Sequence, residues 1–203
     1  MDRMRTTTPL RTAVIAAAAL FALPGTAAAA PAHDTTAATS TARTDPLRPV
    51  ASLAADRLAT ADLVAAAKWG TDSPIDDPAR EQVVLDTVAA QARQIGADPD
   101  EMRRIFRDQI EANKVVQRGL YRRWTTHPDQ APTTKPDLNV VRETINRINT
   151  DLVQAVADTT ARRTSPICRP ELTVAAAEVT LTKHTDLLHT AALTRALPSI
   201  CRN

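Results

Sequence analysis

The chain contains 203 residues, of which 43% are hydrophobic and five are aromatic, and its formal net charge is +2 at pH 7. The first 30 residues hold three of the 25 basic and one of the 23 acidic residues, which leaves 22 of each in the remainder. This balanced remainder argues against nucleic acid or an anionic membrane as a partner.

Residues 1–30 have the three-part pattern of a secretory signal peptide. A basic start, MDRMRTTTPLR, precedes the apolar run TAVIAAAALFAL and the small-residue segment PGTAAAAPA. The apolar run is shorter than the roughly 20 residues that span a bilayer, so we favour a cleaved signal over a membrane anchor. We expect a secreted or extracytoplasmic protein with no membrane attachment after cleavage.

Residues 31–47 are rich in Ala, Thr, Pro and Asp, and we expect a flexible leader there. Residues 48–203 suffice for one domain with a substantial core. Their Ala/Leu/Val/Arg-rich segments alternate with proline clusters and show no strand-like alternation. The pattern predicts an all-α, single-domain helical bundle. Its four main helices are expected near 47–69, 78–95, 99–126 and 138–163, followed by a helical region from about 170 to 197.

Two of these helices begin at an Asp-Pro pair. Asp77 and Asp98 each precede a proline at the first helical position, as N-cap residues do. Glu101 follows Asp98 at capping-box spacing, so we expect its side chain to bond back to the helix start.

Cys168 and Cys201 are the two cysteines of the chain, and in an oxidising compartment we expect them to form a disulfide. A straight helix over 170–197 would separate its ends by roughly 40 Å. A disulfide requires Cα atoms within about 7 Å. We therefore predict an antiparallel helical hairpin that turns at residues 182–186. Two thiols cannot complete a zinc site, and the four histidines lack ligand spacing, so we predict no metal.

Two cations point along the apolar face of the first expected helix. Arg57 lies in the stripe that includes Val50, Leu53 and Val64, and Lys68 falls within about 20° of it on a helical wheel. A single long basic side chain can snorkel to the edge of a core. Two in register, with few acids nearby, favour an inward-facing anion site.

The second and fourth expected helices also carry charges at their apolar stripes. Glu81 is at the centre of one stripe with Asp77 and Arg80 beside it, and Arg142 flanks the other. An alternative for the two acids is a capping role, because the first turn of a helix favours negative charge.

Three amides, Gln109, Asn113 and Gln117, repeat every four residues in the third expected helix, and we interpret them as lining a pocket. Together the inward polar groups are Arg57, Lys68, Asp77, Arg80, Glu81, Asn113, Gln117 and Arg142. This set suits a small ligand with two carboxylates and a hydroxyl, since arginine binds carboxylates through paired hydrogen bonds. It contains no nucleophile–base pair or phosphate-binding loop, which favours binding, or a reaction that needs only positioning and charge stabilisation, without a cofactor.

Several segments resemble the secreted, all-helical chorismate mutases of bacteria. They are DRLATADLVAAAKW, SPIDDPAREQ, ADPDEMRRIFRDQIEANKVVQRG and PDLNVVR, together with the cysteine pair. The resemblance extends from about residue 50 to the C-terminus. It implies a homodimeric enzyme that converts chorismate to prephenate by a Claisen rearrangement.

The resemblance also implies roles for individual residues. Arg57, Arg80 and Arg142 resemble arginines that bind substrate carboxylates, and Lys68 resembles a lysine that reaches a carboxylate and the ether oxygen. Gln117 resembles the donor to the ether oxygen. The catalytic residues expected from this likeness are Lys68, Arg80 and Gln117.

The remaining matches are supporting ones. Asp77 and Glu81 resemble acids that orient the hydroxyl end of the substrate, and Trp69 and Trp124 resemble structural aromatics. Asn113 stands where the family has a serine or threonine that contacts a carboxylate. The alternative to an enzyme is a secreted helical module that binds an anionic metabolite or a partner protein without catalysis.

Overall fold

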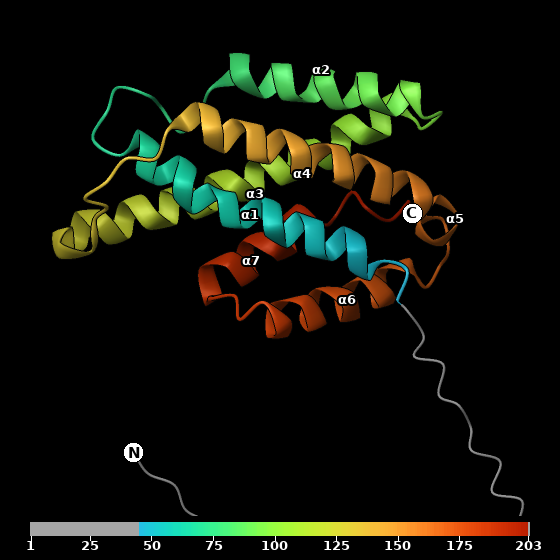
Figure 1. Cartoon of the computed structure of the whole chain (residues 1–203). Coiled ribbons are helices and arrows are strands. Elements are labelled where there is room, and N and C mark those ends of the chain that lie inside the picture. The colour runs from blue at the N-terminus through green and yellow to red at the C-terminus, as the bar shows by residue number, and fades with distance from the viewer. Residues whose placement is uncertain (1–44, 203) are drawn as a thin grey trace, which may run out of the picture. The chain divides into compact units, whose positions relative to one another are not determined.

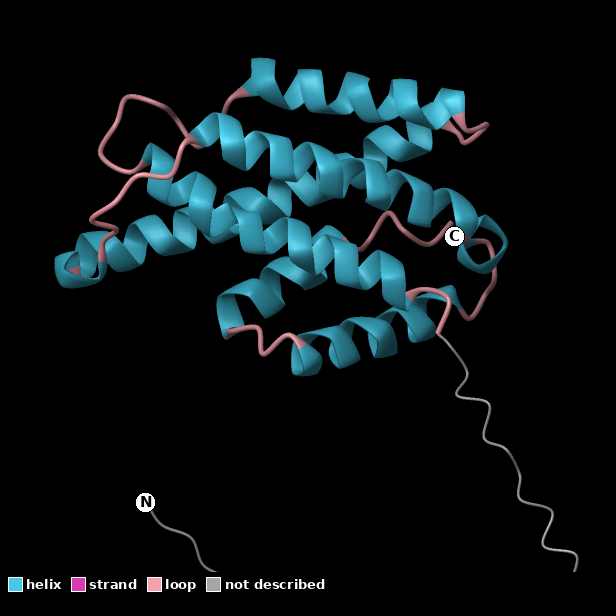
Figure 2. Cartoon of the chain, viewed as in Figure 1, coloured by secondary structure: helices cyan, strands magenta, loops and turns pink. Residues whose placement is uncertain are grey.

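The computed structural model describes residues 45–202, and all the regular structure in this range is helical. The prediction of an all-α fold is confirmed (Figures 1 and 2). The elements are α1 (Arg48–Lys68), α2 (Pro78–Gln94), α3 (Pro99–Thr126), the short 3-10 helix η1 (Pro128–Gln130), α4 (Leu138–Asp158), α5 (Thr160–Arg163), α6 (Cys168–Thr182) and α7 (Leu187–Ala196). The expected signal peptide and residues 31–44 of the expected leader lie outside the described residues.

The predicted N-caps at α2 and α3 are confirmed. The Asp77 carboxylate accepts a hydrogen bond from the backbone N–H of Arg80 (3.0 Å), and that of Asp98 accepts from the N–H groups of Asp100 and Glu101. The predicted capping box is wrong, because the Glu101 carboxylate is bound to arginines at the far end of the chain.

The helices form three layers (Figure 1). α1 and α3 make the middle layer, α2 and α4 pack on one side of it, and α6 and α7 pack on the other. The core between them is apolar, with Leu58, Leu85, Phe106, Leu152 and Leu193 almost fully buried. Leu47, the last residue of the expected leader, is also completely buried. No helix in the described range has both the length and the apolar character needed to cross a membrane.

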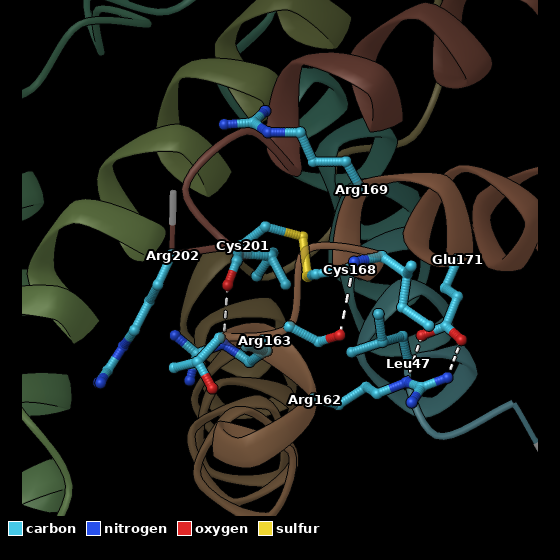
Figure 3. Close-up of a disulfide and its surroundings, with 12 residues drawn as sticks. Leu47, Arg162, Arg163, Cys168, Arg169, Glu171, Cys201 and Arg202 are labelled. Atoms are coloured by element: carbon cyan, nitrogen blue, oxygen red, sulfur yellow. Dashed lines mark hydrogen bonds and ion pairs between the residues drawn. A yellow bond between two sulfur atoms is a disulfide. The ribbon is translucent and has the colours of Figure 1, made fainter.

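The C-terminal hairpin is confirmed, with its turn where the cysteines require it. α6 ends at Thr182, the chain reverses, and α7 starts at Leu187. The reversal includes His184 in the left-handed backbone region (φ 51°). Cys168 and Cys201 form a disulfide with their Cα atoms 5.8 Å apart (Figure 3). Closing a loop of this length stabilises the fold by about 4 kcal/mol in the chain-entropy model.

A buried ion cluster lies beside the disulfide. Arg163 donates to the backbone carbonyls of Val156 (3.0 Å) and Ile200 (2.8 Å), and its guanidinium pairs with Glu101. Arg202 pairs with the same carboxylate. Burial opposes ionisation of Glu101, but the hydrogen bond from Arg202 and the charges of both arginines outweigh it and lower the pKa of Glu101. The cluster joins α3, α5 and the C-terminal segment.

The fourth expected helix, 138–163, is two helices, α4 and α5, separated at Thr159. The Thr159 hydroxyl donates back to the carbonyls of Ala155 and Val156, where α4 ends. The break turns Arg163 toward the carbonyl of Ile200 and the cluster described above.

Candidate active site

One cavity, bounded by the four main helices, collects the polar residues singled out in the sequence. All eight line it: Arg57, Lys68, Asp77, Arg80, Glu81, Asn113, Gln117 and Arg142. Apolar side chains such as Val64, Val84 and Ile145 complete the wall. The cavity therefore combines an apolar surface with a dense set of charged and amide groups.

The helices place these groups by simple periodicity. Arg57 and Lys68 are three turns apart on α1, so both face the same side. Asp77, Arg80 and Glu81 belong to the first turn of α2 and its cap. The connection between α1 and α2 is polar because it forms one wall of the cavity. Asp77 both caps α2 and lines the cavity, so its two interpretations are compatible.

Arg57 is the most deeply buried cation of the cavity, with 4% of its surface exposed. Its Nε donates to Asn149 Oδ1 (2.9 Å) and its Nη1 donates to the carbonyl of Gln109 (2.9 Å). The Phe106 ring centroid is 6.0 Å from its Cζ. Burial lowers the pKa of Arg57 to about 10, so it remains charged at neutral pH. Both hydrogen-bonding partners are neutral.

The other cations of the predicted set are similarly unmatched. Lys68 Nζ donates to the carbonyl of Pro74 (2.7 Å). Burial lowers the pKa of Lys68, the charge of Asp77 opposes this, and the charge of Arg142 adds to it. Within residues 45–202, none of Arg57, Lys68, Arg80 and Arg142 forms an ion pair with a carboxylate. The cavity thus carries positive charge that the protein itself does not neutralise.

A fifth cation, Lys114, was missed in the sequence and behaves differently. Its Nζ lies 2.6 Å from Glu111, 3.1 Å from Glu81 and 3.3 Å from Asp76. Burial opposes its charge, but these hydrogen bonds outweigh burial and raise the pKa of Lys114. Lys114 therefore holds Glu81 and the α1–α2 connection against α3.

Two of the three amides of α3 line the cavity, and the third contacts α7. Gln117 Nε2 donates to Asn113 Oδ1 (2.7 Å), and Gln117 Oε1 is buried with no partner among the described residues. Gln109 does not line the cavity, which corrects the interpretation of three pocket amides. Its side chain instead donates to the carbonyl of Ala196 at the end of α7 (2.8 Å).

Asn149 is the second residue that the sequence reasoning missed. It is 4% exposed, and it lies on α4 two turns after Arg142 and one turn after Ile145. A polar residue within this apolar stripe was the available signal. Its contact with Arg57 joins α4 to α1 at the cavity wall.

The expected structural aromatics pack together at the end of α1. The rings of Trp69 and Trp124 meet edge to face with centroids 5.3 Å apart, and Tyr121 is 4.9 Å from Trp69. This cluster fixes the end of α1 on α3 and so positions the adjacent Lys68.

Comparison with known proteins gives consistent relatives. The family model described as chorismate mutase type II matches residues 49–118, a range with seven of the eight predicted cavity residues. A secreted chorismate mutase of Mycolicibacterium smegmatis is 38% identical over 157 residues, which are 77% of this chain and 87% of the relative. That of Mycobacterium tuberculosis is 33% identical over 159 residues, 78% and 80% of the two chains. The crystal structure of chorismate mutase from Burkholderia phymatum superposes with a TM-score of 0.75 at 34% identity, covering 78% of this chain and 98% of that chain.

Proposed function

The chain belongs to the chorismate mutase family, and from this premise we propose how its cavity converts chorismate to prephenate and where it does so. The observation that carries the proposal is the set of four cations, from three helices, that line one cavity and have no ion-pair partner among residues 45–202. A substrate with two carboxylates supplies the missing negative charge. Arg57, Arg80 and Arg142 bind these carboxylates, since a guanidinium presents paired donors to a carboxylate.

The reaction is intramolecular and requires no group from outside the substrate. A C–O bond breaks as a C–C bond forms, and negative charge develops on the ether oxygen. Lys68 and Gln117 donate hydrogen bonds to this oxygen, and they act mainly on the transition state because the charge is largest there. The arginines hold the two ends of the substrate close together in a compact, chair-like geometry.

The acids and the remaining amide orient the substrate. Asp77 and Glu81 orient the hydroxyl end of the substrate, where the single O–H donates to one of the two carboxylates. The ion pair of Glu81 with Lys114 keeps the Glu81 carboxylate at the cavity wall. Asn113 contacts a carboxylate and also bonds to Gln117.

The direct test is the loss of chorismate absorbance on addition of purified protein lacking residues 1–30. We expect turnover that follows saturation kinetics and disappears in an Arg57→Ala, Lys68→Ala double variant. Chorismate that stays intact while calorimetry detects its binding would instead identify a non-catalytic binding module.

We propose that residues 1–30 are a cleaved signal peptide and that the enzyme domain, 48–203, works outside the cytoplasm after the leader 31–47. The names of the two secreted relatives and the charge and hydropathy pattern of residues 1–30 support this. N-terminal sequencing of the exported protein tests it. A mature protein that starts at Met1, or one retained in the cytoplasm, would contradict it.

We also propose a homodimer in which each site is complete within one chain. The cavity residues of one chain already provide every role proposed above, from binding of the carboxylates to donation to the ether oxygen, and this supports the arrangement. Mixing inactive Arg57→Ala and Arg142→Ala proteins should leave the mixture inactive. Recovery of activity would mean that the two chains share their sites, and a monomer in sedimentation experiments would contradict the dimer.

A further inference from the structure

Arg57 is oriented by two uncharged acceptors from different helices. Asn149 of α4 accepts from Nε, and the Gln109 carbonyl of α3 accepts from Nη1. A guanidinium has five N–H donors, so three remain for a ligand. The positive charge is likewise left unmatched, because both partners are neutral.

We propose that Asn149 is a positioning residue for the reaction, which fixes the Arg57 guanidinium at the cavity while leaving its charge available to a substrate carboxylate. This inference rests on the proposed function and names a residue outside the set that lines the cavity. The essential property of Asn149 is its neutrality. An aspartate has nearly the same shape and would accept the same hydrogen bond, but it would also neutralise the cation.

The same protein uses a carboxylate where a buried arginine has a structural task. Arg163 is 1% exposed, and its partner is the Glu101 carboxylate. Arg57 is 4% exposed, and its side-chain partner is an amide. A protein selected only to stabilise Arg57 would gain from an acid at position 149, because an unpaired buried cation is unfavourable.

The charged groups around Asn149 determine what a substitution by aspartate would do. Asn149 lines a different cavity, between α2 and α4, in which Arg80 is the charged lining residue. Arg80 lines the active-site cavity as well. The charged groups of the active-site wall beyond Arg57 and Arg80 are Lys68, Asp77, Glu81, Lys114 and Arg142. A carboxylate at position 149 would therefore lie beside two cations and stay ionised to well below its ordinary pKa.

The decisive variant is Asn149→Asp. We expect a melting temperature equal to or above that of the wild type, together with a fall in kcat/KM of about 100-fold at pH 7.5, mostly through KM. Because the introduced carboxylate stays ionised, the loss should persist between roughly pH 5 and 8. A purely structural residue would not combine retained stability with a loss of kcat/KM that lies mostly in KM.

Two further variants complete the test. Asn149→Leu removes the acceptor without adding charge and should lower kcat/KM by about 10-fold. Gln154→Glu makes the same amide-to-acid change at an exposed position of α4 and should stay within twofold of the wild type at all pH values.

The outcomes separate this inference from the proposed function. An Asn149→Asp protein that converts or binds chorismate as well as the wild type at pH 7.5 overturns the role of Asn149. A wild type that binds chorismate without converting it overturns the proposed catalysis, and weaker binding by Asn149→Asp then still supports the inference. A wild type that neither binds nor converts chorismate overturns both.

Discussion

Arg57 in α1 and Arg163 in α5 are both almost fully buried, but the protein surrounds them differently. Arg163 has the Glu101 carboxylate and two backbone carbonyls as partners. Arg57 has an amide and one carbonyl, and no acid pairs with it within residues 45–202. A buried charge is costly unless it is matched, so the unmatched site must gain its stabilisation from elsewhere. The difference separates an arginine that holds the fold from one that holds a ligand.

The largest effect on activity should follow from removing a cavity cation that has no ion-pair partner. Arg80→Ala is expected to lower kcat/KM by about 1,000-fold, because a carboxylate contact and its charge stabilisation are lost together. Its melting temperature should stay the same or rise, since no ion pair is broken. Turnover assays and thermal denaturation of the same preparation measure both. An unfolded Arg80→Ala protein would mean that Arg80 belongs with the structural arginines.

Removing Arg163, which pairs with a carboxylate, should lower stability and leave activity nearly unchanged. Arg163→Met leaves the Glu101 carboxylate buried beside only Arg202, which should lower the free energy of unfolding by at least about 3 kcal/mol. Below its melting temperature the variant should keep its kcat within about twofold. The control is Arg169→Met, an exposed arginine near the same disulfide (Figure 3), for which urea denaturation should show little change. Equal losses of unfolding free energy in both variants would show that the pair of Arg163 with Glu101 is not specifically stabilising.

A carboxylate introduced into the cavity should make the activity depend on pH. Gln117→Glu can donate to the ether oxygen only while it is protonated, whereas the amide donates at any ordinary pH. We expect the kcat/KM of the wild type to be nearly constant between roughly pH 5 and 8. The variant should be active toward acid and about 100-fold weaker in kcat/KM at pH 8. Equal activity at pH 8 would leave Lys68 as the remaining donor to the ether oxygen.

The smallest effect concerns a matched cation at the surface of the bundle. Hydrogen bonding to Asp62 raises the pKa of His189 to about 9 against the effect of burial, and Asp186 contributes in the same direction. Because this pKa lies above the ordinary value of about 6.5, the stabilisation is complete below pH 6.5 and is lost as the pH rises through 9.

The wild type should therefore exceed His189→Gln in melting temperature by about 2–4 °C at pH 6, a modest gain because the site is partly exposed. The gap should close by pH 10. Asp62→Asn should reproduce most of the difference. A gap that is constant across this range would show that the imidazole packs there without pairing.

The fold could be predicted from the sequence largely because its signals are local. Asp77 and Asp98 with their following prolines mark helix starts, and two cysteines 33 residues apart require a hairpin. The cavity residues could be found because charges stand out in apolar stripes. Their assignment to one cavity rested on their shared chemistry, and the family resemblance supported it, since periodicity gives the face of each helix but not its neighbour.

The long-range partners could not be predicted for the same reason. Glu101 has good capping-box spacing, but its partners are 62 and 101 residues away. Gln109 shares a stripe with Asn113, yet it reaches α7 because that helix packs on its side of α3. A helical wheel indicates that a side chain points inward and cannot indicate what it will meet.

Gln109 connects the active site to the C-terminal hairpin. Its carbonyl accepts from Arg57, while its side chain donates to Ala196 at the end of the hairpin. Gly119 on the same helix lies so close to Leu188 that a β-carbon there would be 2.6 Å from the leucine methyl groups. The hairpin and the site should therefore open together, and amide hydrogen exchange should detect one cooperative unit. A chain shortened to end after α5 would expose the faces of α1 and α3 that α6 and α7 cover, so the first five α-helices do not make a minimal enzyme.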